Sequence, residues 1–138
     1  MQVLYTAHAV ATGDGRNGHV TSSDGLIDTD VSTPTELGGR GGSTNPEQLF
    51  AAGYAVCFHN ALRLVARRAK ANVDGSEVSA AVGLGPIEGG RYGIQVALTV
   101  SLPGVEAQQA KELVDAAHLV CPYSNATRGN IEVDLQIV

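Results

Sequence analysis

The sequence has little charge, no run of Lys or Arg, and only two cysteines in 138 residues. Charged residues make up 17% of the chain and hydrophobic residues 43%, which excludes an intrinsically disordered or solvating acidic protein. A net charge of -5 without a basic run argues against nucleic acid or an anionic membrane surface as the main partner. The composition is that of a folded domain.

We also expect no targeting signal. Residues 1–5 lack the basic start and small-residue cleavage site of a signal peptide. The longest charge-free apolar stretch, residues 48–62, is expected to be too short to span a bilayer. We therefore expect a cytoplasmic protein without a membrane segment, in a compartment that keeps thiols reduced. There Cys57 and Cys121 are expected to be reactive, metal-binding or buried rather than joined in a structural disulfide.

Length and hydropathy bound the architecture. No internal repeat is visible, and 138 residues predict a single domain over residues 1–138. The mean hydropathy of +0.03 is high for such a chain and indicates more buried apolar surface than one small domain needs. This favours an oligomer.

The first third of the chain predicts a small antiparallel meander. Alternation indicates a strand over residues 3–10, followed by a glycine-rich turn over residues 13–18. Residues 19–22 and 26–31 flank Asp24-Gly25, a favourable hairpin pair. Residues 33–45 form a glycine-rich segment without the Gly-Lys-Ser/Thr ending of a phosphate loop, and we expect a connector or lid there.

A long central helix is predicted from Pro46 to about Ala71. Asn45 can cap it, Pro46 suits the first helical position, and Gln48 can close a capping box. Residues 49–62 carry no fixed charge and are apolar on nearly every face, which indicates a helix surrounded on all sides. A partner subunit is the expected second wall.

The remainder predicts two long strands, a helix, a short helix and a final strand. These elements cover residues 77–87, 92–102, 105–119 and 122–127, and the chain from residue 130 onward. The complete order predicts an α+β domain in which antiparallel strands wrap a buried central helix.

The two cysteines allow more than one interpretation. Cys57 lies mid-helix in apolar surroundings, where a cysteine often serves as a small core residue. Burial raises the pKa of a thiol, so a reactive Cys57 needs a cation from elsewhere in the fold. Cys121 precedes Pro122 and should lie at a helix N-terminus, where amide dipoles favour a thiolate, although such a cysteine can also be merely packed.

A metal site is the other alternative. Cys57 and His59, with His118 and Cys121, supply two thiols and two imidazoles, an inventory that suits zinc. Residues two apart on a helix point about 200° apart, however, so Cys57 and His59 cannot easily share one metal.

Four segments of the sequence match one known family in order. Residues 44–58 and 120–130 resemble the two cysteine motifs of the organic hydroperoxide resistance (Ohr) proteins of the Ohr/OsmC superfamily, and residues 11–16 and 32–39 also resemble that family. The resemblance covers essentially the whole chain. It implies an OsmC-like fold, an intertwined homodimer with sites at the subunit interface, and a thiol peroxidase that reduces alkyl and fatty-acyl hydroperoxides.

The resemblance also implies roles for individual residues. Cys57 is similar to the peroxidatic cysteine and Cys121 to the resolving cysteine, with which it would form a disulfide. Arg16 resembles the arginine that activates the thiolate, with His19 as a rival cation, and Glu47 resembles the carboxylate that orients this arginine. No bound cofactor or metal is implied, and the reductant would be an external dihydrolipoyl group on a protein. Three aromatic residues are expected to favour a hydrocarbon-bearing substrate: Phe50, Tyr54 and Phe58.

One geometric consequence concerns the spacing along the helix. Glu47 and Cys57 are ten residues apart, about 15 Å in one helix. Either the helix bends between them, or the polar pair and the thiol of one site come from different subunits. Two further readings use the same residues: a redox sensor that switches a partner's binding, and a zinc-stabilised structural protein.

Overall fold

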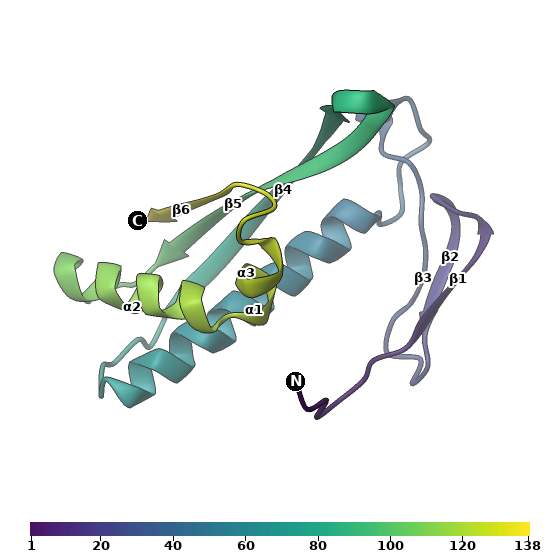
Figure 1. The fold of residues 1–138 in the computed structure, drawn as a ribbon. Coiled ribbons are helices and arrows are strands. Elements are labelled where there is room, and N and C mark those ends of the chain that lie inside the picture. Colours follow the sequence, from purple (N-terminus) through teal and green to yellow (C-terminus); the bar gives the residue numbers. More distant parts are fainter. The chain divides into compact units, whose positions relative to one another are not determined.

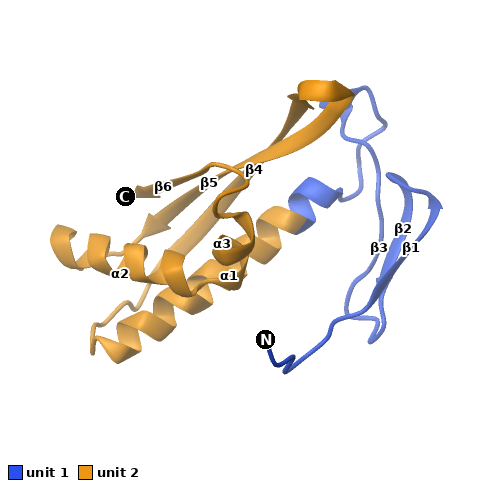
Figure 2. Cartoon of the chain, viewed as in Figure 1, with its two compact units in different colours: residues 1–49 blue, residues 50–138 orange.

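The computed structural model describes residues 1–138 as two compact units, Met1–Leu49 and Phe50–Val138 (Figure 2). The single domain expected over residues 1–138 stays a prediction. The order of strands and helices agrees with the sequence-based expectation, as Figure 1 shows.

The first unit contains a three-stranded antiparallel sheet in the order β1-β2-β3. Its strands are β1 (Ala9–Asp14), β2 (Asn17–Ser22) and β3 (Asp28–Asp30). The strand expected over residues 3–10 is therefore wrong, because β1 begins at Ala9 and continues into the expected turn. Pairing extends to Asp14 and Asn17, so that only Gly15 and Arg16 form the turn. Arg16 consequently lies at the tip of a tight hairpin.

Two glycines allow this hairpin to close. Gly13 pairs with Gly18 across the strands, and Gly13 has a positive φ of 75°. A Cβ atom on Gly18 would overlap the carbonyl oxygen of Thr12. The cross-strand contact thus requires a residue without a side chain at position 18.

The glycine-rich connector leads from β3 to the long helix. It contains a short 3₁₀ helix, η1 (Thr35–Leu37), which ends at Gly38 in the left-handed conformation. Val31 and Thr44 form an isolated parallel bridge that brings the chain to the start of helix α1.

Helix α1 (Pro46–Arg68) begins where its cap predicts. The side chain of Asn45 accepts a hydrogen bond from the backbone N–H of Gln48 at 2.8 Å. The expected capping box is wrong, because the Gln48 side chain instead accepts from the Thr44 hydroxyl at 3.0 Å.

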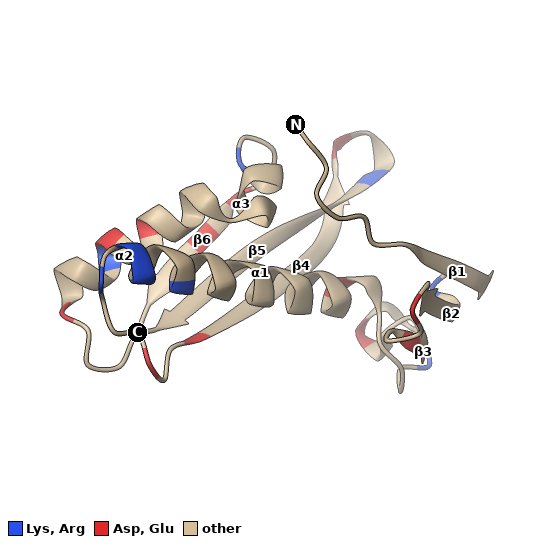
Figure 3. Ribbon diagram, turned by 90° about the horizontal axis from the view of Figure 1, so that it is seen from below, with Lys and Arg blue, Asp and Glu red and all other residues tan.

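The helix ends three residues before the expected Ala71. Lys70 adopts a positive φ of 53°, and the N–H of Ala71 donates to the carbonyl of Ala66. This left-handed residue and wrapped-back hydrogen bond are a common helix stop. Lys and Arg gather at this end of α1 (Figure 3), where cations favour the negative end of the helix dipole.

The second unit contains the sheet β4-β5-β6. Strands β4 (Glu77–Ile87) and β5 (Arg91–Ser101) form an antiparallel hairpin, joined by the 3₁₀ turn η2 (Glu88–Gly90). The last strand, β6 (Val133–Ile137), pairs with β5 in parallel. The sequence predicted antiparallel strands throughout, but helices α2 (Ala107–Val120) and α3 (Pro122–Thr127) form a crossover between β5 and β6, which returns the chain in the same direction.

The core of the second unit lies between α1, α2 and one face of the sheet. Alternate residues of β5 point into it, which is the face that period-two alternation predicted. The α+β class with a long central helix is confirmed. The buried side chains of the helix are Tyr54, Phe58, Ala61, Leu62, Val65 and Ala66.

Helix α1 is long and apolar enough by length and composition to cross a membrane. The expectation that its apolar segment is too short is therefore wrong, because the helix continues through Leu64 and Val65 beyond the stretch considered. Core helices of soluble proteins share this property. The packing of α1 against α2 and β5 assigns it to the core.

Replacement of Gly18 by Ala should disrupt the β1–β2 hairpin, because its methyl group would collide with the backbone of Thr12. We expect a loss of about 1–3 kcal/mol of unfolding free energy, typical of overpacking, and faster amide exchange in β1 and β2. Gly85→Ala is the matched control, because a Cβ there meets nothing within 4 Å. Equal stability of the two variants in urea titrations would contradict this reading.

Candidate functional site

The structure brings the two sulfur atoms together. Cys57 lies in helix α1, and Cys121 ends α2 and caps the start of α3. Their Sγ atoms are 3.7 Å apart across 64 positions of sequence. Cys121 is fully buried and Cys57 is half-buried. Both thiols are free, and the more accessible of the two is the one on the central helix.

The position of Cys121 follows from its neighbour in the sequence. Cys121 has extended backbone angles, φ -61° and ψ 121°, as the residue before a proline prefers. Pro122 then begins α3 at the first helical position, as predicted. The break between α2 and α3 therefore aims the Cys121 side chain at α1.

The surroundings of Cys57 oppose its ionisation. Burial raises the pKa of the Cys57 thiol, and the adjacent thiol of Cys121 raises it further. The backbone N–H of Tyr123, in the first turn of α3, acts in the opposite direction and lowers this pKa. The sequence predicted that the amides at the start of α3 favour a thiolate at Cys121. In the structure the amide of Tyr123 instead lowers the pKa of Cys57, on helix α1.

Arg16 and Glu47 form a bidentate ion pair within the first unit. The guanidinium donates from Nη1 to Oε2 at 3.0 Å and from Nη2 to Oε1 at 2.6 Å. The hydrogen bond from Arg16 lowers the pKa of Glu47, and Glu47 raises the pKa of Arg16. Both groups are therefore charged at neutral pH, and the planar pairing fixes the direction of the guanidinium.

His19, the rival cation, has other partners. Its ring nitrogens contact Asp30 at 2.8 Å and Asp28 at 2.5 Å. The hydrogen bond with Asp30 raises the pKa of His19 most, and the one with Asp28 raises it further. Arg16 is thus the cation that Glu47 holds.

The expected pocket residues do not share one environment. Tyr54 and Phe58 have no exposed surface and belong to the core, whereas Phe50 is partly exposed. The ring of Tyr123 packs against Phe50 and Tyr54, with ring centroids 5.8 Å and 5.6 Å away. Sequence reasoning missed Tyr123, although its place directly after Cys121-Pro122 could have indicated it.

The imidazoles that a zinc site would need point elsewhere. His118 Nδ1 contacts the Ser124 hydroxyl at 2.9 Å, and His59 Nε2 contacts the Ser76 hydroxyl at 3.0 Å. No group of three or more His, Cys, Asp or Glu side chains could hold a metal ion. The zinc-stabilised reading therefore lacks its ligand set.

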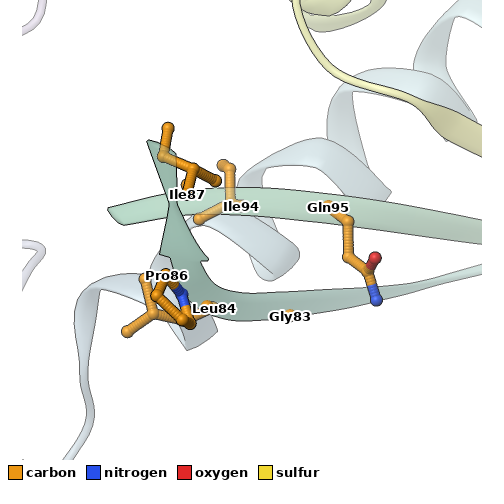
Figure 4. A pocket seen from close by; sticks show the side chains of 8 residues that line it. Gly83, Leu84, Pro86, Ile87, Ile94 and Gln95 are labelled. Atoms are coloured by element: carbon orange, nitrogen blue, oxygen red, sulfur yellow. The ribbon is translucent and has the colours of Figure 1, made fainter. Parts of the chain in front are cut away.

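A cavity of about 280 Å³ lies on the β4–β5 hairpin (Figure 4). Its lining contains none of the four candidate catalytic side chains, and the sulfur pair does not open into it. The residues around it are Gly83, Leu84, Gly85, Pro86, Ile87, Gly93, Ile94 and Gln95.

Comparisons with known proteins identify the family of this chain. Residues 39–136 match the OsmC-like protein family. The organic hydroperoxide resistance protein of Xanthomonas axonopodis pv. citri is 55% identical, and the match covers 99% of this chain and 96% of that protein.

Two solved structures have the same fold over nearly the whole chain. The crystal structure of an organic hydroperoxide resistance protein from Legionella pneumophila has a TM-score of 0.94 and 48% identity, with 99% of this chain and 98% of that chain covered. The organic hydroperoxide resistance protein OhrB of Bacillus subtilis has a TM-score of 0.90 and 46% identity, with coverage of 99% and 100%. The chain therefore belongs to the OsmC-like family, and within it to the organic hydroperoxide resistance (Ohr) proteins.

Proposed function

We propose that this protein is a cysteine-based peroxidase that reduces organic hydroperoxides and protects the cell from them. The observation that carries the proposal is the 3.7 Å separation of a half-buried and a buried thiol on two different helices. Organic hydroperoxide resistance, the property named for its relatives, supports the choice of substrate.

The proposed reaction uses the two sulfurs in sequence. The Cys57 thiolate attacks the outer oxygen of the hydroperoxide, the O–O bond breaks, and the alkoxide takes a proton and leaves as alcohol. Cys57 is then a sulfenic acid. The Cys121 sulfur attacks the Cys57 sulfur, the S–O bond breaks, and the hydroxide leaves as water with the proton of the Cys121 thiol. A Cys57–Cys121 disulfide remains.

The cycle closes through an external dithiol. Thiol–disulfide exchange transfers two electrons and two protons from the reductant to the protein disulfide. We propose a dihydrolipoyl group on another protein as the donor, with no cofactor bound by this chain, and a cytoplasmic location, where reducing equivalents are available.

In this proposal Arg16 and Glu47 supply the charge that Cys57 lacks. Burial raises the pKa of Cys57, so the thiolate needs a cation beside it. Arg16 stays charged at any physiological pH, and its bidentate pair with Glu47 aims it. We assign Arg16 as the residue that activates the thiolate and Glu47 as the residue that orients Arg16.

The aromatic residues near the sulfurs bear on the substrate. Phe50 and Tyr123 retain exposed surface, and the buried ring of Tyr54 packs against both of them. Phe58 lies in the core. Apolar rings of this kind favour a hydrocarbon-bearing hydroperoxide over hydrogen peroxide, because burial of its alkyl chain adds binding free energy.

We further propose that the active form is an intertwined homodimer. Val56, adjacent to Cys57 on the central helix, is 72% exposed in the single chain, although α1 is apolar on nearly every face. Helix α1 is continuous between Glu47 and Cys57. We therefore propose that the ion pair serving one thiol comes from the other copy.

Replacement of Cys57 by Ser should abolish turnover of cumene hydroperoxide with dihydrolipoamide, because no thiolate remains to attack the peroxide. Cys121→Ser should permit one oxidising event per chain and then stall as the sulfenic acid. A coupled assay gives turnover, and mass spectrometry gives the state of Cys57. Normal turnover by Cys57→Ser would exclude this mechanism.

Replacement of Arg16 by Lys, or of Glu47 by Gln, should slow the first step about tenfold or more at pH 7. Each unit by which the pKa of Cys57 rises lowers the thiolate fraction about tenfold. The rate of each variant should recover as pH rises and the thiol ionises. Rapid-mixing kinetics against pH measure this shift, with the exposed Arg91→Lys as control. Unshifted profiles would remove both residues from the mechanism.

The lowered pKa of Glu47 predicts the acid limit of the Arg16–Glu47 ion pair. Because Arg16 holds the pKa of Glu47 below its ordinary 4.5, the wild-type protein should still keep the ion pair at pH 4.5 and lose it only as the pH falls through the lowered pKa. The wild-type rate should then approach that of Glu47→Gln in acid.

Mixed dimers test the sharing of residues between copies. If each site combines Cys57 of one chain with Arg16 of the other, a dimer of Arg16→Met and Cys57→Ser chains contains one intact site. Co-refolding the two inactive variants should then restore activity to about a quarter of wild type, because half of a random mixture is mixed dimer and each has one site of two. Activity that does not return in verified mixed dimers would place Arg16 and Cys57 of one site in the same chain.

A further inference from the structure

Three hydroxyl groups and one imidazole form a chain of hydrogen bonds between the helices that carry the two cysteines. Ser124 Oγ contacts His118 Nδ1 at 2.9 Å and Tyr54 Oη at 3.0 Å. Tyr54 Oη contacts Thr127 Oγ1 at 3.0 Å, and Thr127 Oγ1 donates to the Ser124 carbonyl. Tyr54 and Ser124 have no exposed surface.

Counting protons gives this chain a direction. The Thr127 hydroxyl donates its only proton to the Ser124 carbonyl. Thr127 must therefore accept from Tyr54, which is the donor in that hydrogen bond. Ser124 then donates to Tyr54, which leaves His118 as the donor to Ser124. The reverse direction would abandon the bond from Thr127 to the carbonyl. Only the direction that begins at His118 Nδ1–H satisfies all four bonds.

This direction specifies the tautomer of His118. Burial, followed by the charge of Arg128, lowers the pKa of His118. The ring is therefore neutral at pH 7, with its proton on Nδ1 and a free lone pair on Nε2.

The hydrogen-bond chain runs beside the sulfur pair. Tyr54 precedes Cys57 by three residues on α1, and positions three apart are neighbours on a helix. His118 precedes Cys121 by three residues and Ser124 follows it by three. The polar chain and the sulfurs therefore form two adjacent bridges between the same segments, α1 on one side and the α2–α3 junction on the other.

The distance left to close shows why this second bridge matters. A disulfide is about 2.05 Å long, so the sulfurs at 3.7 Å must approach by roughly 1.7 Å. If α1 and the α2–α3 junction are tied together, side-chain rotation can supply this movement. Without the tie the helices can separate, and a misplacement of about 1 Å can cost a factor of a hundred in rate.

We propose that Ser124, with Tyr54, Thr127 and His118 as its partners, positions Cys121 for attack on the Cys57 sulfenic acid. These residues act through geometry and contact neither substrate nor sulfur in this role. The inference rests on the proposed function and extends it: the resolving step depends on the buried hydroxyls, whereas the first reaction with peroxide does not.

Ser124→Ala and Thr127→Val should therefore separate the two steps. We expect an unchanged rate of reaction of Cys57 with cumene hydroperoxide, and disulfide formation slowed roughly ten- to hundredfold. The longer-lived sulfenic acid should be trapped by dimedone and should overoxidise to sulfinic acid at lower peroxide concentration, both measured by mass spectrometry. Thr127→Ser, which keeps the hydroxyl, should resolve at the wild-type rate.

His118 provides a second pair of variants. His118→Asn retains an N–H donor near the position of Nδ1, and His118→Leu does not. Asn should support resolution better than Leu. In the wild-type protein, the ring ¹⁵N chemical shifts of His118 at pH 7 should report a neutral ring with the proton on Nδ1, a measurement that needs no variant to fold.

Three outcomes would overturn the inference: resolution by Ser124→Ala and Thr127→Val at the wild-type rate, equal slowing of both steps, or a His118 ring with its proton on Nε2. If wild type consumed no hydroperoxide, the proposed function would fail instead. Closure of the disulfide by diamide, a general thiol oxidant, would then still compare the variants, and equal closure rates would contradict the positioning role.

Discussion

Burial of the Cys57 thiol is the constraint on which the rest of this structure depends. The helix that carries Cys57 is the core of the second unit, so the sulfur lies in surroundings that raise its pKa and disfavour the thiolate. The proposed chemistry needs that thiolate. The Tyr123 amide offsets part of this cost, because it lowers the pKa of Cys57, and we propose that Arg16 supplies the missing charge.

The ion pair of Arg16 and Glu47 suits that task because of its geometry. A guanidinium held at two nitrogen–oxygen contacts cannot rotate freely, so its charge is directed before any substrate arrives. The β1–β2 hairpin also helps to fix the guanidinium. Strand pairing leaves only a two-residue turn at Arg16, and the close Gly13–Gly18 contact restricts the backbone next to it. Both the hairpin and the ion pair therefore restrict the position of the Arg16 charge.

Cys121 and the Tyr123 amide both lie at the break between α2 and α3. Pro122 ends one helix and starts the next, which frees the Tyr123 amide to face Cys57 and turns Cys121 toward α1. The parallel pairing of β6 with β5 follows from the same crossover. Pro122 thus shapes the site, because it fixes where α2 stops and α3 begins, whereas the direction of β6 depends on the whole crossover.

Local signals in the sequence predicted much of the fold. Asn45-Pro46 predicted the start of the central helix, and Cys121-Pro122 predicted the break between α2 and α3. The alternation in residues 92–102 predicted the strand with the buried face. The start of β1 was missed, because the alternation over residues 3–10 carries no information about which residues find a partner strand. The parallel pairing of β6 was missed for a related reason, since strand direction depends on the whole crossover.

The sequence by itself determined the elements, the family resemblance and the residue types available for chemistry, because helix caps, prolines and periodicity act over a few neighbouring residues. Only the tertiary structure decided which of those residues meet. The approach of Cys57 to Cys121, the two-point grip of Glu47 on Arg16 and the hydrogen-bond chain through Ser124 join positions 31 to 73 residues apart. Contacts at such separation arise from packing of the complete chain, and no local pattern encodes them.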